Sequence, residues 1–184
     1  MTVKVLGVAG SLRRDSHNRK LLRAAGALLP PEVEFTEYDG LKLIPPFDED
    51  DEPAPPLAVA HWREAIEDTD AILFATPEYN SSIPGHLKNA IDWASRPVKT
   101  AALRNKPVAV VGASTGMFGA VWSQAELRKV LASAGARVIE REFPVPSAHE
   151  AFHEDGRLVD GDTTLELSSV VAELVDSARR RLAA

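Results

Sequence analysis

Strand-like and helix-like patterns of apolar residues alternate along the whole chain. Short, nearly continuous apolar runs rich in β-branched side chains are typical of strands that are buried on both faces. Five segments are predicted as strands: residues 4–9, 33–38, 70–76, 106–113 and 137–143. Apolar residues at helical spacing predict five helices: residues 19–29, 57–67, 84–94, 121–134 and 163–182.

A polar loop, residues 10–18, joins the first predicted strand to the first helix. Unpaired backbone N–H groups and the positive end of the helix dipole make such a junction an anion site. The loop lacks the Gly-x-Gly-x-x-Gly spacing of dinucleotide folds and the Gly-Lys-Ser/Thr ending of NTPase loops. Its donors suit a phosphomonoester: Ser11, Arg13, Arg14, Ser16 and Asn18. The alternative is that Ser16 only caps the helix and that the arginines are solvated.

The alternation predicts an α/β fold with a single domain over residues 1–184. Helices that connect parallel strands cover both faces of a sheet through right-handed crossovers. With the phosphate loop after the first strand, we expect a doubly wound, five-stranded parallel sheet in the order 2-1-3-4-5. Ligands then bind at the carboxyl ends of the strands, near the switch point between strands 1 and 3. The loops after strands 1, 3 and 4 should therefore meet at one site.

The amino-acid composition limits the kinds of partner and the kinds of chemistry that we expect. Lys and Arg total 21 and Asp and Glu 27, a formal net charge of −6, which disfavours nucleic-acid binding through phosphate neutralisation. The sequence has no cysteine, which excludes disulfides, thiolate nucleophiles and thiolate metal sites, so redox chemistry would need a cofactor. No apolar run approaches a membrane span and no signal peptide is evident, so we expect a cytoplasmic protein with no membrane contact.

Two further loops at the expected site carry unusual residues. Residues 76–83, after the third strand, offer a ring, a carboxamide, hydroxyls and backbone amides between prolines. That surface suits a flat heteroaromatic ligand with hydrogen-bonding edges. Residues 112–119, after the fourth strand, form a glycine-rich turn that enters a helix.

The sequence closely resembles the NADPH-dependent FMN reductase family, which includes FMN-dependent quinone, azo-dye and chromate reductases on a flavodoxin-like fold. Two motifs are present without gaps: Gly-Ser-Leu-Arg-x-x-Ser-x-Asn, and Pro-Glu-Tyr-Asn-x-Ser-x-Pro-Gly-x-Leu-Lys-Asn-Ala-Ile-Asp-Trp-x-Ser-Arg. The resemblance implies FMN contacts from three loops: Ser11, Arg13, Ser16 and Asn18 at the phosphate, Pro77, Glu78, Tyr79, Asn80 and Ser81 along the ribityl chain and ring edge, and Ser114, Thr115 and Gly116 on the other side. Arg13 would supply the principal charge.

The resemblance further implies an FMN-dependent NAD(P)H oxidoreductase. Hydride would pass from NADPH or NADH through FMN to a small-molecule acceptor: a quinone, an azo compound, a free flavin or a metal oxyanion. The flavin carries the chemistry, so no residue is assigned as catalytic. Trp122 stands near a place where the family often has arginine, so the preference for NADPH or NADH stays open. The identity of the electron acceptor stays open as well.

Two other functions remain as alternatives. A flavodoxin-type FMN electron carrier would share the fold but would need a separate reductase, because it has no NAD(P)H reductase activity of its own. A receiver-like signalling domain needs acidic residues at the end of the first strand, where this chain has Ala9, Gly10 and Ser11.

We also expect self-association, as a homodimer or a tetramer. The helix 84–94 carries Leu87, Ile91 and Trp93, more large apolar surface than one sheet face needs. The resemblance implies that this helix packs against its counterpart across a two-fold axis. Glu78 and the flavin would then lie near the partner chain.

The segment His149-Glu150-Ala151-Phe152-His153 matches the zinc-protease pattern His-Glu-x-x-His. That chemistry needs a helix and a third ligand downstream, whereas this segment has loop composition and no histidine follows His153. We therefore expect no metal site, and a loop near the mouth of the flavin site. The remaining histidines, at positions 17, 61 and 86, are expected at the surface.

Overall fold

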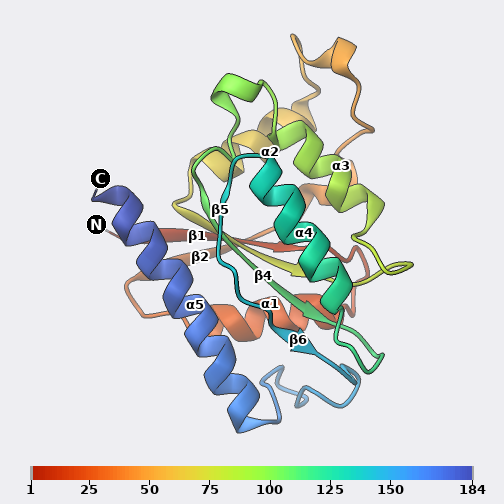
Figure 1. The fold of residues 1–184 in the computed structure, drawn as a ribbon, viewed down its shortest axis with the longest axis vertical. Coiled ribbons are helices and arrows are strands. Elements are labelled where there is room, and N and C mark those ends of the chain that lie inside the picture. Colours follow the sequence, from red (N-terminus) through yellow and green to blue (C-terminus); the bar gives the residue numbers. More distant parts are fainter. Residues whose placement is uncertain (1, 184) are drawn as a thin grey trace.

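The computed structural model describes residues 2–183, in which one sheet lies between two layers of helices (Figure 1). The strands are β1 (Val3–Ala9), β2 (Val33–Tyr38), β3 (Ala71–Thr76), β4 (Pro107–Ala113), β5 (Arg137–Val138) and β6 (Pro144–Val145). The α-helices are α1 (His17–Ala27), α2 (Leu57–Glu67), α3 (Gly85–Ala94), α4 (Val121–Ser133) and α5 (Gly161–Leu182). Short 3-10 helices lie at Gly40–Leu43, Glu49–Asp51 and Val98–Thr100.

All strand pairs are parallel and follow the order β2-β1-β3-β4-β5, which confirms the predicted architecture. The helices α1 and α5 pack on one face of the sheet, and α2, α3 and α4 on the other (Figure 1). Successive side chains of a strand point to opposite faces, so Val5 of β1 joins the first core and Leu6 the second. β3 and β4 are buried throughout, as their continuous apolar runs predict.

The fifth strand, predicted as one segment over residues 137–143, is interrupted. β5 and β6 each pair two residues with β4, and the chain between them leaves the ladder. The side chain of Arg128 in α4 is buried and donates from Nη2 to Glu142 at 2.8 Å. The buried amide of Gln124 accepts the N–H of Phe143 at 3.0 Å. Side chains of α4 thus bind residues 142 and 143, within the interruption between β5 and β6.

The apolar residues of α3 lie inside the protomer, so their predicted role as dimer contacts is wrong. Leu87 and Trp93 are fully buried, and Ile91 is 1% exposed. The Trp93 ring packs edge-on against Phe47 with 4.9 Å between centroids, and its Nε1–H donates to the carbonyl of Pro45 at 2.9 Å. The long loop before α2 therefore covers this face of α3.

The helix boundaries depend on caps. Helix α1 begins at His17, earlier than predicted, because Ser16 has extended backbone and its hydroxyl accepts the N–H of Arg19. Asp160 caps α5 through the N–H of Thr163 at 2.7 Å. Within residues 2–183, no helix is both long and apolar enough to span a membrane.

Candidate functional site

The loops after β1, β3 and β4 meet at the carboxyl edge of the sheet, as the strand order predicts. They enclose a cleft of about 170 Å³. Its lining includes most of the predicted site residues: Ser11, Arg13, Ser16, Asn18, Pro77, Glu78, Tyr79, Ser114 and Thr115. His17 and Ala113 complete the lining, whereas Asn80, Ser81 and Gly116 lie outside it.

The first loop presents hydroxyl donors next to a helix N-terminus. Ser11 and Ser16 are only 4% and 3% exposed. Each side-chain oxygen accepts a backbone N–H, from Arg13 at 3.4 Å and from Arg19 at 3.3 Å. Each hydroxyl proton thus stays available to donate toward the cleft. Ser16 is therefore a helix cap and a potential ligand donor together.

Asn18 joins two of the loops. Its Nδ2 donates to the carbonyl of Ala113 and its Oδ1 accepts the N–H of the same residue, both at 2.9 Å. These two hydrogen bonds hold the start of α1 against the end of β4 inside the protein. The carboxamide therefore fixes the floor of the cleft, and the N–H of Asn18, in the first helical turn, lacks an intrahelical acceptor.

The second loop is a tight hairpin. Tyr79 and Ser82 exchange backbone hydrogen bonds of 3.0 and 3.1 Å. Asn80 and Ser81 between them have φ of 53° and 59°, the left-handed pair of a type I′ turn. This geometry carries both residues to the tip and leaves Tyr79 beside the cleft with 44% of its surface exposed.

The base of that hairpin is anchored to α4. The Oε2 of Glu78 accepts the N–H groups of Trp122 and Ser123, both at 3.1 Å, and so places a carboxylate at the positive end of the helix dipole. The hydroxyls of Thr76 and Ser123 both donate to the carbonyl of Pro77 at 2.9 Å. Thr76 and Ser123 are not predicted as site residues from the sequence, because a hydroxyl at a strand end or helix start carries no distinctive pattern.

Two histidines expected at the surface are instead part of the site. The Nε2 of His86 lies 2.7 Å from the carbonyl oxygen of Gly10 and fixes the start of the first loop. A Cβ on Gly10 would lie 2.9 Å from Cδ2 of Leu87, so any larger residue there would have to displace that buried side chain. His17 is half-buried and lines the cleft. Only His61 is exposed as expected.

Exposed apolar side chains lie on the loops after β3 and β4 that contribute to the cleft, and on the start of α4. Tyr79, Met117, Phe118 and Trp122 are 44%, 75%, 54% and 48% exposed. The rings of Phe118 and Trp122 meet edge-on with 4.8 Å between centroids. This aromatic rim, made of these four residues, offers a surface for a flat ligand or for another protein chain.

The His-Glu-x-x-His segment does not form the helix that zinc proteases require. Residues 149–153 form turns, and Phe152 pairs with Leu158 in an isolated bridge. Across residues 2–183, no group of three or more His, Asp or Glu side chains is placed to hold a metal ion.

Comparison with known proteins identifies relatives over the whole chain. Residues 3–150 match the family model described as NADPH-dependent FMN reductase. The NAD(P)H-dependent FMN reductase of Pseudomonas aeruginosa is 42% identical over 184 residues, 98% of this chain and 97% of the relative. The 2-hydroxy-1,4-benzoquinone reductase of a Burkholderia species is 34% identical over 182 residues, 98% and 99% of the two chains. The solved flavoenzyme NAD(P)H:(acceptor) oxidoreductase FerB of Paracoccus denitrificans is 35% identical, with a TM-score of 0.85 and coverage of 97% and 98%.

Proposed function

The chain belongs to the NADPH-dependent FMN reductase family and is an FMN-dependent NAD(P)H oxidoreductase with a flavodoxin-like fold, and we propose that FMN binds in the cleft between the loops after β1, β3 and β4. Bound FMN would accept hydride from NAD(P)H and pass reducing equivalents to a second substrate. Relatives named as NAD(P)H-dependent FMN reductase and as NAD(P)H:(acceptor) oxidoreductase do not favour the alternative of an electron carrier. We also propose a cytoplasmic location, because NAD(P)H, the co-substrate, is a cytoplasmic metabolite.

The observation that carries this position is the donor set of the first loop. Two buried hydroxyls, the guanidinium of Arg13 and the first turn of α1 converge on one cleft. Donors of this kind suit a phosphomonoester, because the charge, the helix dipole and the hydroxyl protons all favour oxyanions. The residues present therefore fit the phosphate of FMN.

The size of the cleft supports a proposal for the rest of the ligand. A space of about 170 Å³ is smaller than the ~300–1,000 Å³ of pockets that enclose a drug-sized ligand. The phosphate and ribityl chain would be enclosed, with the hairpin residues Pro77 to Ser81 and the turn Ser114 to Gly116 on either side. The ring would lie against the aromatic rim, where a second flat substrate could reach it.

The protein residues would orient the cofactor and would carry no bond-making step themselves. The Glu78 carboxylate, the Pro77 carbonyl and the Asn18 carboxamide are already occupied by protein partners. They therefore hold the loop backbones in place, and the backbone amides and Tyr79 remain to contact the ligand. Rigid placement of this kind lowers the entropy that binding loses.

We propose a quinone as the electron acceptor. The Burkholderia relative is named as a benzoquinone reductase, and two Pseudomonas putida relatives, 39% identical over 155 residues, as quinone reductases. The aromatic rim supports this choice, since Phe118 and Trp122 suit stacking with a flat, weakly charged ring.

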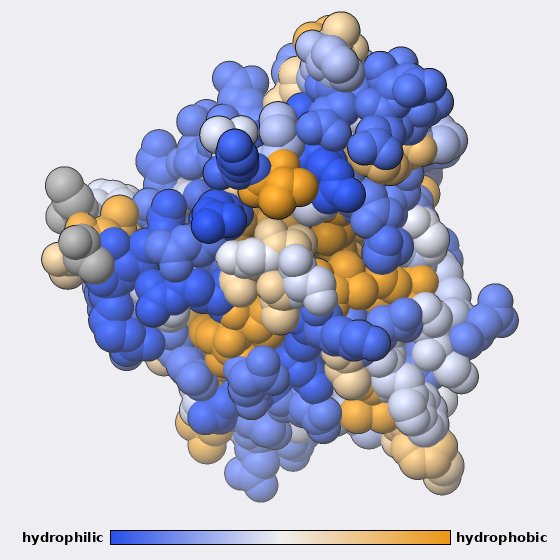
Figure 2. Space-filling view, turned by 45° about the horizontal axis from the view of Figure 1, so that its top comes forward, coloured by the Kyte–Doolittle hydropathy of each residue, from blue (hydrophilic) through white to orange (hydrophobic). Residues whose placement is uncertain are grey.

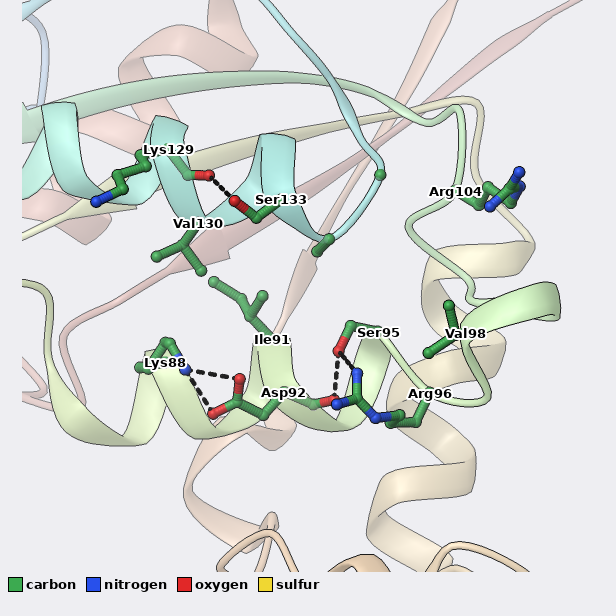
Figure 3. Close-up of a pocket in the computed structure, with 12 residues that line it drawn as sticks. Lys88, Ile91, Asp92, Ser95, Arg96, Val98, Arg104, Lys129, Val130 and Ser133 are labelled. Atoms are coloured by element: carbon green, nitrogen blue, oxygen red, sulfur yellow. Dashed lines mark hydrogen bonds and ion pairs between the residues drawn. The ribbon is translucent and has the colours of Figure 1, made fainter.

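We also propose that the protein is a homodimer. Figure 2 shows apolar side chains gathered in the middle of one face, within a surface that is otherwise largely hydrophilic. A groove of about 340 Å³ lies between α3 and α4. Ile91 and Val130 point toward each other there (Figure 3). Val98 at its edge is 63% exposed, and Lys88 and Asp92 on its rim form an ion pair of 2.7 Å. A rim with charges of both signs suits the self-complementary contact of a two-fold interface.

The function is tested with the purified protein reconstituted with FMN. Initial rates with NADPH and a benzoquinone, varied together, should give the parallel double-reciprocal lines of a ping-pong cycle. Riboflavin in place of FMN should bind more weakly, since it cannot use the phosphate donors. Failure to bind FMN under any reconstitution would contradict the proposal.

A further inference from the structure

His17 is the one cleft residue whose side chain has a buried nitrogen left without a partner. Its Nδ1 is inaccessible to water and makes no hydrogen bond within residues 2–183. An unsatisfied buried polar atom lowers stability, so such an atom calls for an explanation. The residue stands at the first position of α1, directly after Ser16, and lines the same cleft as the phosphate donors.

The ring of His17 is held in place by the segment that carries the His-Glu-x-x-His pattern. Phe152 lies nearly parallel to the ring, at 14° and with 6.4 Å between centroids. His149 of the same segment is close enough to act on His17 electrostatically, and its Nε2 lies 3.4 Å from the carboxylate of Glu150. The loop after β6 thus forms a wall beside the phosphate loop.

The charged groups that face His17 come from three elements. They are Arg13 from the first loop, Lys20 from α1, and His149, with Glu150 beside it, from the loop after β6. Burial, then the positive charges of Lys20 and Arg13 and, least, an electrostatic effect of His149, lower the pKa of His17 below its ordinary value of 6.5. The ring is therefore mostly neutral at pH 7 in the free protein.

We propose that His17 is a second cationic ligand of the FMN phosphate, beside Arg13, and that it takes up a proton when the cofactor binds. This rests on the position of FMN given above. A phosphate dianion in the cleft offsets the cations that keep the ring neutral, and it favours the charged imidazolium. Protonation turns both ring nitrogens into donors, so the ring can donate a charge-assisted hydrogen bond to phosphate.

The direction of the pH effect on FMN binding follows from a comparison of the free protein with the FMN complex. The complex binds one more proton at His17 than the free protein, so FMN affinity rises as the pH falls, by at most about tenfold per pH unit. The phosphate of a monoester becomes protonated only near a pKa of about 6. Between about pH 8.5 and about pH 7 the ligand charge is therefore nearly constant, and the protein accounts for the change.

The experiment compares the intact protein with His17→Phe and His17→Gln. The Phe variant keeps a ring against Phe152 without a titrating nitrogen, and the Gln variant guards against a packing effect of Phe. Dissociation constants for FMN and riboflavin are measured by flavin fluorescence from about pH 8.5 to about pH 7. Calorimetry in two buffers of different ionisation enthalpy gives the protons taken up. His153→Ala, an exposed histidine of the same loop, is the matched control.

We expect the intact protein and His153→Ala to bind FMN several-fold more tightly at the lower pH, with uptake of a fraction of a proton. Both His17 variants should lose that pH dependence and bind FMN about tenfold more weakly near pH 7. Riboflavin should show no proton uptake with any of these proteins. The same pH dependence in the His17 variants, or equal proton uptake with riboflavin, would overturn the role of His17 while leaving FMN binding intact. A protein that binds no FMN would overturn the proposed function as well.

Discussion

Replacement of Arg13 by alanine separates a phosphate contact from general flavin binding. The guanidinium lines the cleft, and its one hydrogen bond within residues 2–183 is long, 3.4 Å from Nη2 to the carbonyl of Asp15. Its removal should therefore leave the fold intact. A charge-assisted hydrogen bond contributes about 1.5–3 kcal/mol, which corresponds to about a 10- to 150-fold change in Kd. Because the side chain is exposed, we expect a loss in the lower half of that range.

Arg14 is the matched control, since it is the next residue, is equally exposed and does not line the cleft. Arg14→Ala should change FMN affinity by less than about 0.5 kcal/mol. Titration followed by flavin fluorescence gives both constants, and riboflavin should bind the parent and Arg13→Ala equally. Added salt should weaken FMN binding to the parent more than to Arg13→Ala. Unchanged FMN affinity in Arg13→Ala, or an equal loss for riboflavin, would refute the assignment.

Three further predictions concern assembly and stability. Val98→Asp at the edge of the α3–α4 groove should shift the protein from dimer to monomer in light scattering. Leu165→Asp, at a similarly exposed position on α5, should leave the dimer intact. A parent protein that is already monomeric would contradict the interface. Glu78→Ala removes the carboxylate that caps α4 and should lower the free energy of unfolding in urea by about 1 kcal/mol. An unchanged free energy would mean that the two N–H contacts do not stabilise the fold. Burial lowers the pKa of Lys106 from 10.5 to about 8, so the unfolded chain binds more protons between those values and stability should rise with pH there. Lys106→Met should abolish that rise, and a parent with flat urea stability from about pH 8 to about pH 10.5 would show the shift to be wrong.

The order of the sheet and the place of the site follow from the sequence, because both depend on local patterns. Continuous apolar runs identify the buried strands, and the loop 10–18 predicts an anion site at the end of β1, where the structure has a cleft. Parallel topology then brings the three loops together without further information. The cap at Ser16 is likewise a local feature, and the sequence offered it as the alternative for that residue.

The parts that the sequence does not reveal depend on contacts between distant segments. The helical pattern predicts Trp93 at an interface, whereas in the structure the loop at Pro45 covers it. The residues between β5 and β6 contact Arg128, which comes from α4. The partners of Asn18 lie 95 positions away in the sequence. A helical pattern shows which face is apolar, but it does not show whether this chain or another covers that face.

The central claim is that this chain itself accepts hydride from a nicotinamide through FMN bound at the cleft. The measurement is an anaerobic titration of the FMN-loaded protein with NADPH and, separately, NADH, followed by the absorbance band of the flavin. We predict that the band bleaches with about one equivalent of nicotinamide per bound flavin, without any added reductase, and returns when a benzoquinone is added. Bound flavin that stays oxidised with both nicotinamides, but is reduced after a separate reductase is supplied, would contradict the account and identify an electron carrier.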